Sequence, residues 1–174
     1  MSPEVAETIL IKIRSKTKAD IALVDINQFI LTLAQYWRQN LTNEYMDGVD
    51  GAPVWFEYEH RIWDLGETVR TYLKSQSLGA KEGVLEAAVK IIDNPKYGKG
   101  RQSFASLIGD FGGGAYGELL AFHLNDPEIG GHCLKAMLKS KIRGHTSKAE
   151  EILSKSRGWI KAVAKKYIDF DKDK

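Results

Sequence analysis

Two stretches of this chain repeat one pattern: residues 84–95 read VLEAAVKIIDNP, and residues 116–127 read YGELLAFHLNDP. They lie 32 residues apart, and each is an apolar helical pattern that ends at an acid and amide pair followed by proline. After each proline a short break leads into a second amphipathic run, residues 98–111 in the first copy and 128–143 in the second. The sequence therefore predicts a recurring unit of two helices joined by a tight turn.

A third, more degenerate copy fits residues 147–153 and 157–170, with Ser154-Lys155-Ser156 in place of the acid and proline turn. The apolar positions of the second helices recur at similar spacing: Phe104, Leu107 and Ile108, then Leu134, Met137 and Leu138, then Ile160, Val163, Ala164 and Ile168. Helix pairs repeated at about 30 residues are typical of an α-solenoid, whose stacked units form a binding surface.

The N-terminal part predicts three helices. Ser2 is a hydroxyl N-cap before Pro3, and Val5, Ile9 and Ile13 form one apolar stripe of the first helix. Asp20 is placed to cap a second helix that runs to about Asn40 and is apolar around much of its circumference, so we expect it to be central and buried. Residues 43–53 form a loop, residues 55–74 a third helix, and Gly79 its C-terminal cap.

These patterns predict an all-α protein: a right-handed, solenoid-like stack of about three helix pairs preceded by a three-helix portion. We place the N-terminal cap at residues 1–79, the repeats at 80–170 and a frayed polar tail at 171–174. The whole length is expected to form a single compact domain.

Composition excludes several classes of protein. Cys133 is the only cysteine, so an internal disulfide framework and a cysteine-rich zinc site are excluded, and a cytoplasmic location is expected. Charged residues interrupt the first apolar run, and no stretch approaches 18 uncharged apolar residues, so we expect neither a secretion signal nor a membrane span. No cofactor or bound metal is expected.

Charge is distributed unevenly along the chain. Residues 44–67 hold seven acids and one base, Arg61, whereas residues 135–166 hold ten bases and two acids. The sequence therefore predicts an acidic middle segment and a basic C-terminal segment, each a candidate surface for a partner of opposite charge.

Residues 118–138, ELLAFHLNDPEIGGHCLKAML, resemble a HEAT-type helical repeat, and Asp93-Asn94-Pro95 repeats its turn one unit earlier. The resemblance covers roughly residues 81–170. Ile129-Gly130-Gly131 stands where the family usually carries a Val-Arg step, and only residues 157–161 in the third unit hold something similar. The resemblance implies an α-solenoid with a scaffold or binding role. A minority of HEAT-like proteins bind or process nucleic acids, and some act on protein-linked pigments.

Residues 112–117, GGGAYG, match the glycine pattern of a phosphate-binding loop. That function requires a strand before the glycines, whereas the sequence predicts a helix on both sides. We therefore favour a linker between repeats, whose glycines permit a sharp turn, over an anion site at a helix start.

The acidic middle segment is the first candidate site. We expect it to bind a protein partner through the acidic and aromatic side chains Tyr45, Trp55, Glu57, Glu59, His60, Trp63 and Asp64. Two alternatives remain open: a general acid and base pair of an enzyme, and a solvated helix face on which Arg61 and Arg70 pair with the acids. A metal site built from Glu57, His60 and Asp64 lacks further ligands.

The basic segment is the second candidate site, for nucleic acid or an acidic partner, through Lys135, Lys139, Arg143, Arg157, Lys161 and Lys165. The first three are spaced as a stripe on one helix. Trp159 and Tyr167 suit core positions, so aromatic side chains for base stacking are sparse.

The leading hypothesis is a non-enzymatic protein-interaction module, such as a small bacterial adaptor, inhibitor or immunity-type partner. Nucleic-acid binding through the basic helices is the alternative, and an enzyme that uses the acidic segment is the third possibility.

Overall fold

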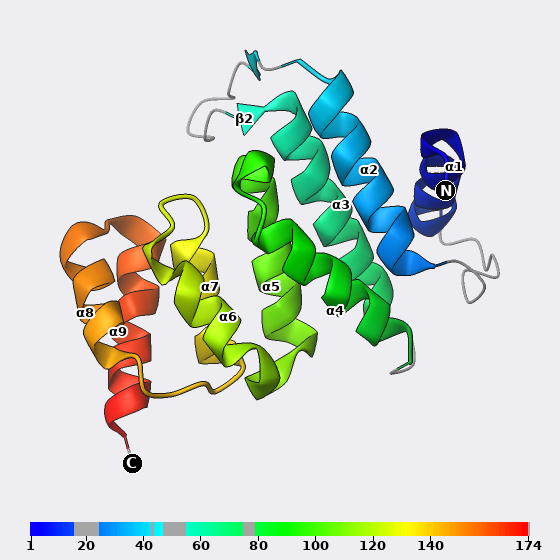
Figure 1. Ribbon diagram of the computed structural model, residues 1–174. Helices are drawn as coiled ribbons and strands as arrows, with labels where there is room; N and C mark the ends of the chain where they lie inside the picture. Colours follow the sequence, from blue (N-terminus) through cyan, green and yellow to red (C-terminus); the bar gives the residue numbers. More distant parts are fainter. Residues whose placement is uncertain (16–24, 43, 47–54, 75–78, 174) are drawn as a thin grey trace. The chain divides into compact units, whose positions relative to one another are not determined.

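The computed structural model describes residues 1–15, 25–42, 44–46, 55–74 and 79–173, and helices dominate them (Figure 1). The predicted all-α class is confirmed. The chain divides into two compact units, Met1–Phe104 and Ala105–Lys174. The boundary predicted after residue 79 lies inside the first unit, because α4 (Gly79–Ile92) packs against α2 (Ile26–Asn40) there.

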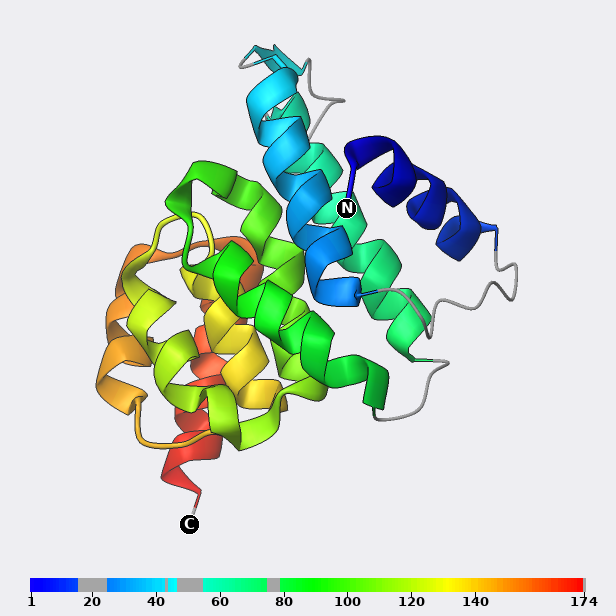
Figure 2. The ribbon, with the colours of Figure 1, turned by 45° about the vertical axis from the view of Figure 1, so that its right-hand side comes forward.

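In the first unit, α2 is the central helix and contacts α1 (Pro3–Arg14), α3 (Glu57–Leu73) and α4. Figures 1 and 2 show α2 and α3 side by side, with α1 against this pair. The predicted central place of α2 is confirmed, but the helix buries one face rather than most of its circumference, and Tyr36 is exposed. The buried side chains follow the helical period; they are Phe29, Ile30, Leu33, Ala34 and Trp37.

The predicted apolar stripe of α1 is wrong at Val5, which is 52% exposed. The buried row is instead Ala6, Ile9, Leu10 and Ile13. Two polar contacts hold α1 in this orientation. The indole Nε1 of Trp37 donates to Glu7 at 2.9 Å, and Arg14 forms an ion pair with Asp64 on α3.

The helix starts follow ordinary capping chemistry. The Ser2 hydroxyl accepts from the Val5 amide at 3.4 Å, as expected for the N-cap of α1. Asp25 caps α2 by accepting from the Gln28 amide at 3.0 Å, whereas the predicted cap, Asp20, lies outside the described residues.

A two-residue antiparallel ladder precedes α3. It pairs β1 (Tyr45–Met46) with β2 (Trp55–Phe56), and Tyr45 lies opposite Phe56. Two residues are too few for an alternating pattern, so the sequence predicted no strand here. Most of the predicted loop at residues 43–53, namely residue 43 and residues 47–53, lies outside the described part of the chain.

The buried carboxylate of Glu59 ties the start of α3 to the turn after α4. Its Oε2 accepts from the Phe56 amide at 3.0 Å, and its Oε1 accepts from the Lys99 amide at 3.1 Å. Gly98, between α4 and α5 (Arg101–Phe111), leaves room for this carboxylate: it has φ of 49°, and a Cβ there would lie 1.8 Å from Oε1. We call these contacts the Glu59 junction.

Arg101 completes the Glu59 junction from the other side of Gly98. The side chain is 2% exposed, and its Nε donates to the Gly98 carbonyl at 2.9 Å. Its guanidinium also donates to the Ile92 carbonyl at 3.3 Å, which caps the C-terminal end of α4. A buried carboxylate and a buried guanidinium are stable only when both are hydrogen-bonded, as Glu59 and Arg101 are here.

The predicted helix pairs are present at residues 79–172, with short 3₁₀ segments at their joints. The first pair is α4, then η2 (Pro95–Gly100) and α5. The second pair and its joints comprise η3 (Gly113–Tyr116), α6 (Gly117–Phe122), η4 (His123–Asn125) and α7 (Gly130–Lys139). The third pair is α8 (Thr146–Lys155) and α9 (Gly158–Lys172).

Both predicted turns contain a side-chain cap. Asn94 Oδ1 accepts from the Lys96 amide at 3.1 Å, and Asp126 Oδ1 accepts from the Glu128 amide at 2.9 Å. The glycine-rich segment has helices on both sides, and Gly113 has φ of 62°, so the prediction of a linker is confirmed.

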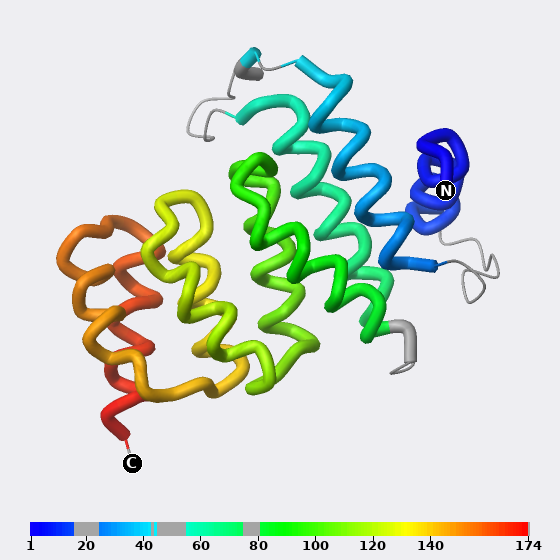
Figure 3. The backbone as a smooth tube through the Cα atoms, viewed as in Figure 1, coloured from blue at the N-terminus to red at the C-terminus, as the bar shows by residue number. Residues whose placement is uncertain are grey.

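In the second unit, α7 packs on α6 and α9, and α8 packs on α9. These helices can be followed by their colours, from yellow-green to red, in the backbone tube of Figure 3. Close helix approach depends on Gly109 of α5, where a Cβ would lie 2.7 Å from the Cα of Ala136 on α7. The predicted fraying of the tail is wrong at Asp171, which lies in α9 and accepts from the Gly144 amide at 2.8 Å and from the Thr146 hydroxyl.

Three glycine substitutions separate the two reasons for glycine in the Glu59 junction. We expect Gly98→Ala to lower the free energy of unfolding by more than about 2 kcal/mol, because the backbone strain at positive φ and the clash with Glu59 both destabilise the folded state. Gly113→Ala has positive φ but open space, so we expect a loss of roughly 1 kcal/mol. Denaturant titration followed by circular dichroism measures each value.

Gly114→Ala is the control, since a Cβ there meets no atom within 4 Å and φ is not positive. We expect it to change the free energy of unfolding by less than about 0.5 kcal/mol. If Gly98→Ala is as stable as Gly114→Ala, the tight fit of Glu59 against Gly98 does not exist.

Candidate functional site

Three rings from the acidic middle segment lie together on the first unit. Trp55 of β2 contacts His60 and Trp63 of α3 edge-on, with ring centroids 6.4 and 6.0 Å apart, and His60 stacks on Trp63 at 6.3 Å. Trp55 and Trp63 are half-buried and His60 is exposed. We call these three residues the aromatic cluster. Each of its members was among the predicted partner-binding residues.

The acids near the aromatic cluster are matched by arginines of the same chain. Glu57 lies 3.8 Å from Arg61 one turn along α3, and Asp64 pairs with Arg14 of α1. The surface beside the aromatic cluster therefore carries paired charges, and its acids are less available to a basic partner than the sequence suggested.

Glu59 and Tyr45 stand apart from the other predicted members of this site. Glu59 is 3% exposed and belongs to the Glu59 junction, so its carboxylate does not reach the surface that the aromatic cluster occupies. Tyr45 belongs to β1, and the structure describes its backbone pairing with Phe56.

The predicted basic stripe on one helix is wrong at its third member, because α7 ends at Lys139 and Arg143 lies beyond it. The Arg143 guanidinium donates to the Asp173 carbonyl at 2.7 Å and to that of Phe170, so it caps the C-terminal end of α9. Lys139 forms an ion pair with Asp110 of α5. Both cations therefore stabilise contacts within the second unit.

The remaining basic residues gather around α9. Arg157, Lys161, Lys165 and Lys166 are exposed, and none has an ion-pair partner in the described part of the chain. Trp159, which was expected in the core, is 46% exposed. Lys135 of α7 lies over its ring, with Nζ 5.8 Å from the ring centroid. We call these residues and Trp159 the basic face. Tyr167 is buried, as predicted.

His132 of α7 lies against the basic face, with its ring centroid 4.8 Å from that of Trp159. Burial of the imidazole, helped by the nearby charge of Lys135, lowers the pKa of His132 to about 4. The imidazole is therefore neutral at physiological pH and adds no positive charge to the basic face.

Metal binding finds no support among the side chains that the structure describes, because no three of His, Cys, Asp and Glu are grouped to hold an ion. Cys133 is buried in the core. Across the described ranges, no helix combines the length and apolar character that a membrane span requires.

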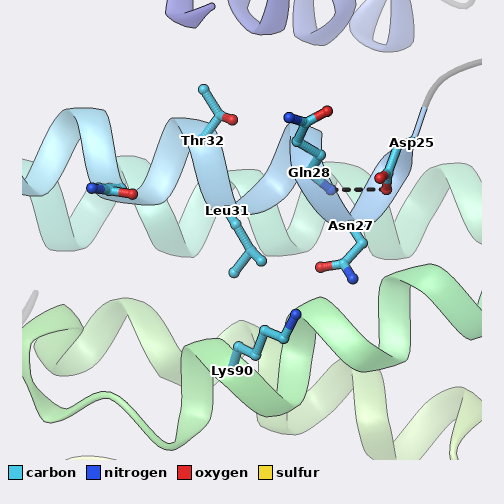
Figure 4. A pocket seen from close by; sticks show the side chains of 7 residues that line it. Asp25, Asn27, Gln28, Leu31, Thr32 and Lys90 are labelled. Carbon is cyan, nitrogen blue, oxygen red and sulfur yellow. Dashed lines mark hydrogen bonds between the residues drawn. The ribbon is translucent and has the colours of Figure 1, made fainter. Parts of the chain in front are cut away.

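Sequence reasoning missed an open, polar pocket in the first unit. It lies between α2 and α4, and seven residues line it: Asp25, Asn27, Gln28, Leu31, Thr32, Gln35 and Lys90 (Figure 4). In the sequence this pocket is indicated only by polar residues on one side of α2, and the same pattern is typical of any helix face exposed to solvent.

No family model, no curated protein and no solved structure matches the chain.

Proposed function

We propose that this chain is a non-enzymatic protein-interaction module that anchors its partner on the aromatic cluster of Trp55, His60 and Trp63. The observation that carries the proposal is the mutual contact of three rings that remain partly open to solvent. The residues that dominate binding at protein interfaces are enriched in Trp, since its ring offers a large rigid area that a partner can desolvate. A solvated acidic helix face does not account for this clustering.

The charges around the aromatic cluster suit such an interface. The Glu57–Arg61 and Asp64–Arg14 pairs place both signs of charge beside the rings. Interfaces commonly surround an aromatic centre with a polar, solvent-accessible rim. The partner is therefore selected through the fit of an apolar or aromatic group, with the charged rim setting its orientation.

The helix pairs of residues 79–172 support a HEAT-like, α-solenoid-type stack as the scaffold of this module. Asn94 and Asp126 cap equivalent turns, and the paired helices follow one another in the predicted order. A scaffold that displays rigid helices fits an adaptor, an inhibitor or an immunity-type partner.

Affinity capture from the native host, followed by mass spectrometry, tests the proposed interface. The bait is the full chain, compared with Trp63→Ala and with His60→Ala, which removes an exposed ring and therefore spares the fold. We expect one protein to be lost from both variants, and its purified form to bind Trp63→Ala roughly 30-fold more weakly, the effect of an interface hot spot.

Tyr36→Ala is the matched control, since Tyr36 is an exposed aromatic residue of α2 outside the aromatic cluster. This variant is expected to capture the same protein as the unmodified chain. Circular dichroism verifies that each variant is folded. Equal capture by all four baits would show that the aromatic cluster does not anchor a partner.

Nucleic-acid binding through the basic face is the second candidate function, and the exposure of Trp159 favours it. Trp159 is half-exposed with the Lys135 ammonium group over its ring, and Arg157, Lys161 and Lys165 are exposed cations of the same helix or of the residue before it. This combination is typical of proteins that bind single strands without sequence preference. Lys139 and Arg143 make contacts within the chain and are therefore less available to phosphate groups, so we rank nucleic-acid binding second.

A gel shift with a random single-stranded oligonucleotide at several salt concentrations tests this candidate. We expect binding that weakens steeply with salt and is lost in the double variant Lys161→Glu and Lys165→Glu, because phosphate contacts release counterions. The control is Lys12→Glu with Lys96→Glu, which changes net charge equally on exposed residues of the first unit. Equal binding by both double variants, or no binding at low salt, removes this candidate.

A further inference from the structure

The pocket between α2 and α4 is an open depression with a volume of about 420 Å³, lined by the start of α2 and by Lys90 of α4. Its polar lining distinguishes it from an apolar docking groove. Figure 4 shows Asn27 and Leu31 extending from α2 toward α4, and Lys90 extending from α4 toward α2. These three side chains converge on one space.

Asn27 carries an unsatisfied acceptor in this lining. Its Oδ1 is buried without a hydrogen-bond partner, and it is alone in this among the side-chain atoms of the described residues. The amide orientation is fixed, because Nδ2 donates to Glu86 of α4 at 3.0 Å. Exchange of the oxygen and nitrogen would set a carbonyl oxygen against the Glu86 carboxylate. A buried acceptor without a partner is costly, so a ligand that donates here is favoured.

Lys90, in contrast to Asn27, offers a positively charged donor that requires a negatively charged acceptor. It is exposed, and neither an ion pair nor a hydrogen bond is found for its ammonium group within the described part of the chain. Lys90 lies four residues after Glu86 on α4, so its attachment point is about one helical turn, roughly 6 Å, from the residue that holds Asn27. A group that satisfies Lys90 is an anion.

Asp25 adds negative charge at the Asn27 end of the pocket. One of its oxygens caps α2 through the Gln28 amide, a contact drawn in Figure 4, and its charge remains beside the pocket. Figure 4 shows the Lys90 ammonium group extending toward Asn27, so a hydrogen-bond acceptor and a positive charge lie close together in the pocket, with the Asp25 charge beside them.

We propose that this pocket binds a small zwitterion, namely a free α-amino acid. Its ammonium group donates to Asn27 Oδ1 beside Asp25, its carboxylate pairs with Lys90, and its side chain lies against Leu31. A simple anion leaves Asn27 without a donor, and a simple cation or a neutral sugar leaves Lys90 without a counter-charge. The approach of the Lys90 ammonium group toward Asn27 in Figure 4 suits the short separation of the two charges in an α-amino acid.

Two-dimensional ¹⁵N–¹H NMR of the full chain tests the site with three probes that differ in charge. L-alanine carries both charges, N-acetyl-L-alanine lacks the ammonium group, and L-alaninamide lacks the carboxylate. We expect L-alanine at millimolar concentration to shift the amide signals of α2 and α4 saturably. Each of the other probes is expected to bind at least about tenfold more weakly, the usual effect of one lost charge-assisted hydrogen bond.

Two substitutions locate the site, and a third controls for charge. We expect Lys90→Gln and Asn27→Ala to weaken the binding of L-alanine about tenfold each, while Lys12→Gln, which removes an exposed lysine of α1, leaves it unchanged. Equal binding of all three probes overturns the proposal. So does the absence of saturable shifts in α2 and α4, or binding to Lys90→Gln that equals binding to the unmodified chain.

Discussion

The buried carboxylate of Glu59 is the contact on which the described part of the first unit depends most. It receives the amides of Phe56 and Lys99, which lie on elements distant in sequence, and it fits only because residue 98 is glycine. Arg101, at the start of α5, is also buried and donates to the carbonyls of Gly98 and Ile92. A buried charge without such partners costs several kcal/mol. The start of α3 and the turn after α4 therefore keep their native structure together, and loss of one disrupts the other.

This constraint also determines what α3 displays. An α-helix turns about 100° per residue, so a helix whose Glu59 and Ile62 face inward presents His60 and Trp63 toward solvent. Trp55 joins these rings because β2 leads directly into α3, with Phe56 as its N-cap. The Glu59 junction therefore positions the aromatic cluster, although Glu59 itself takes no part in that surface. Rigid support of this kind lowers the entropy cost of binding a partner.

Local patterns in the sequence predicted the helices well, because the apolar period and the capping residues Ser2, Asn94 and Asp126 act within a few residues of themselves. Long-range contacts escaped prediction. Glu59 accepts from an amide 40 residues away, and the pocket between α2 and α4 depends on a helix register in which Asn27 contacts Glu86, 59 residues apart. Exposure of Trp159 and the capping role of Arg143 likewise depend on how α7 and α9 pack, which helical periodicity does not specify.

Amide hydrogen exchange at Phe56 and Lys99 tests the central claim most directly, since both N–H groups donate to Glu59. The structure predicts that both amides exchange as slowly as the core amides of α3, and that Glu59→Gln accelerates the two together by roughly tenfold or more. Exchange of both amides in the unmodified chain at the rate of freely exposed positions would contradict the Glu59 junction and the positioning of the aromatic cluster that follows from it.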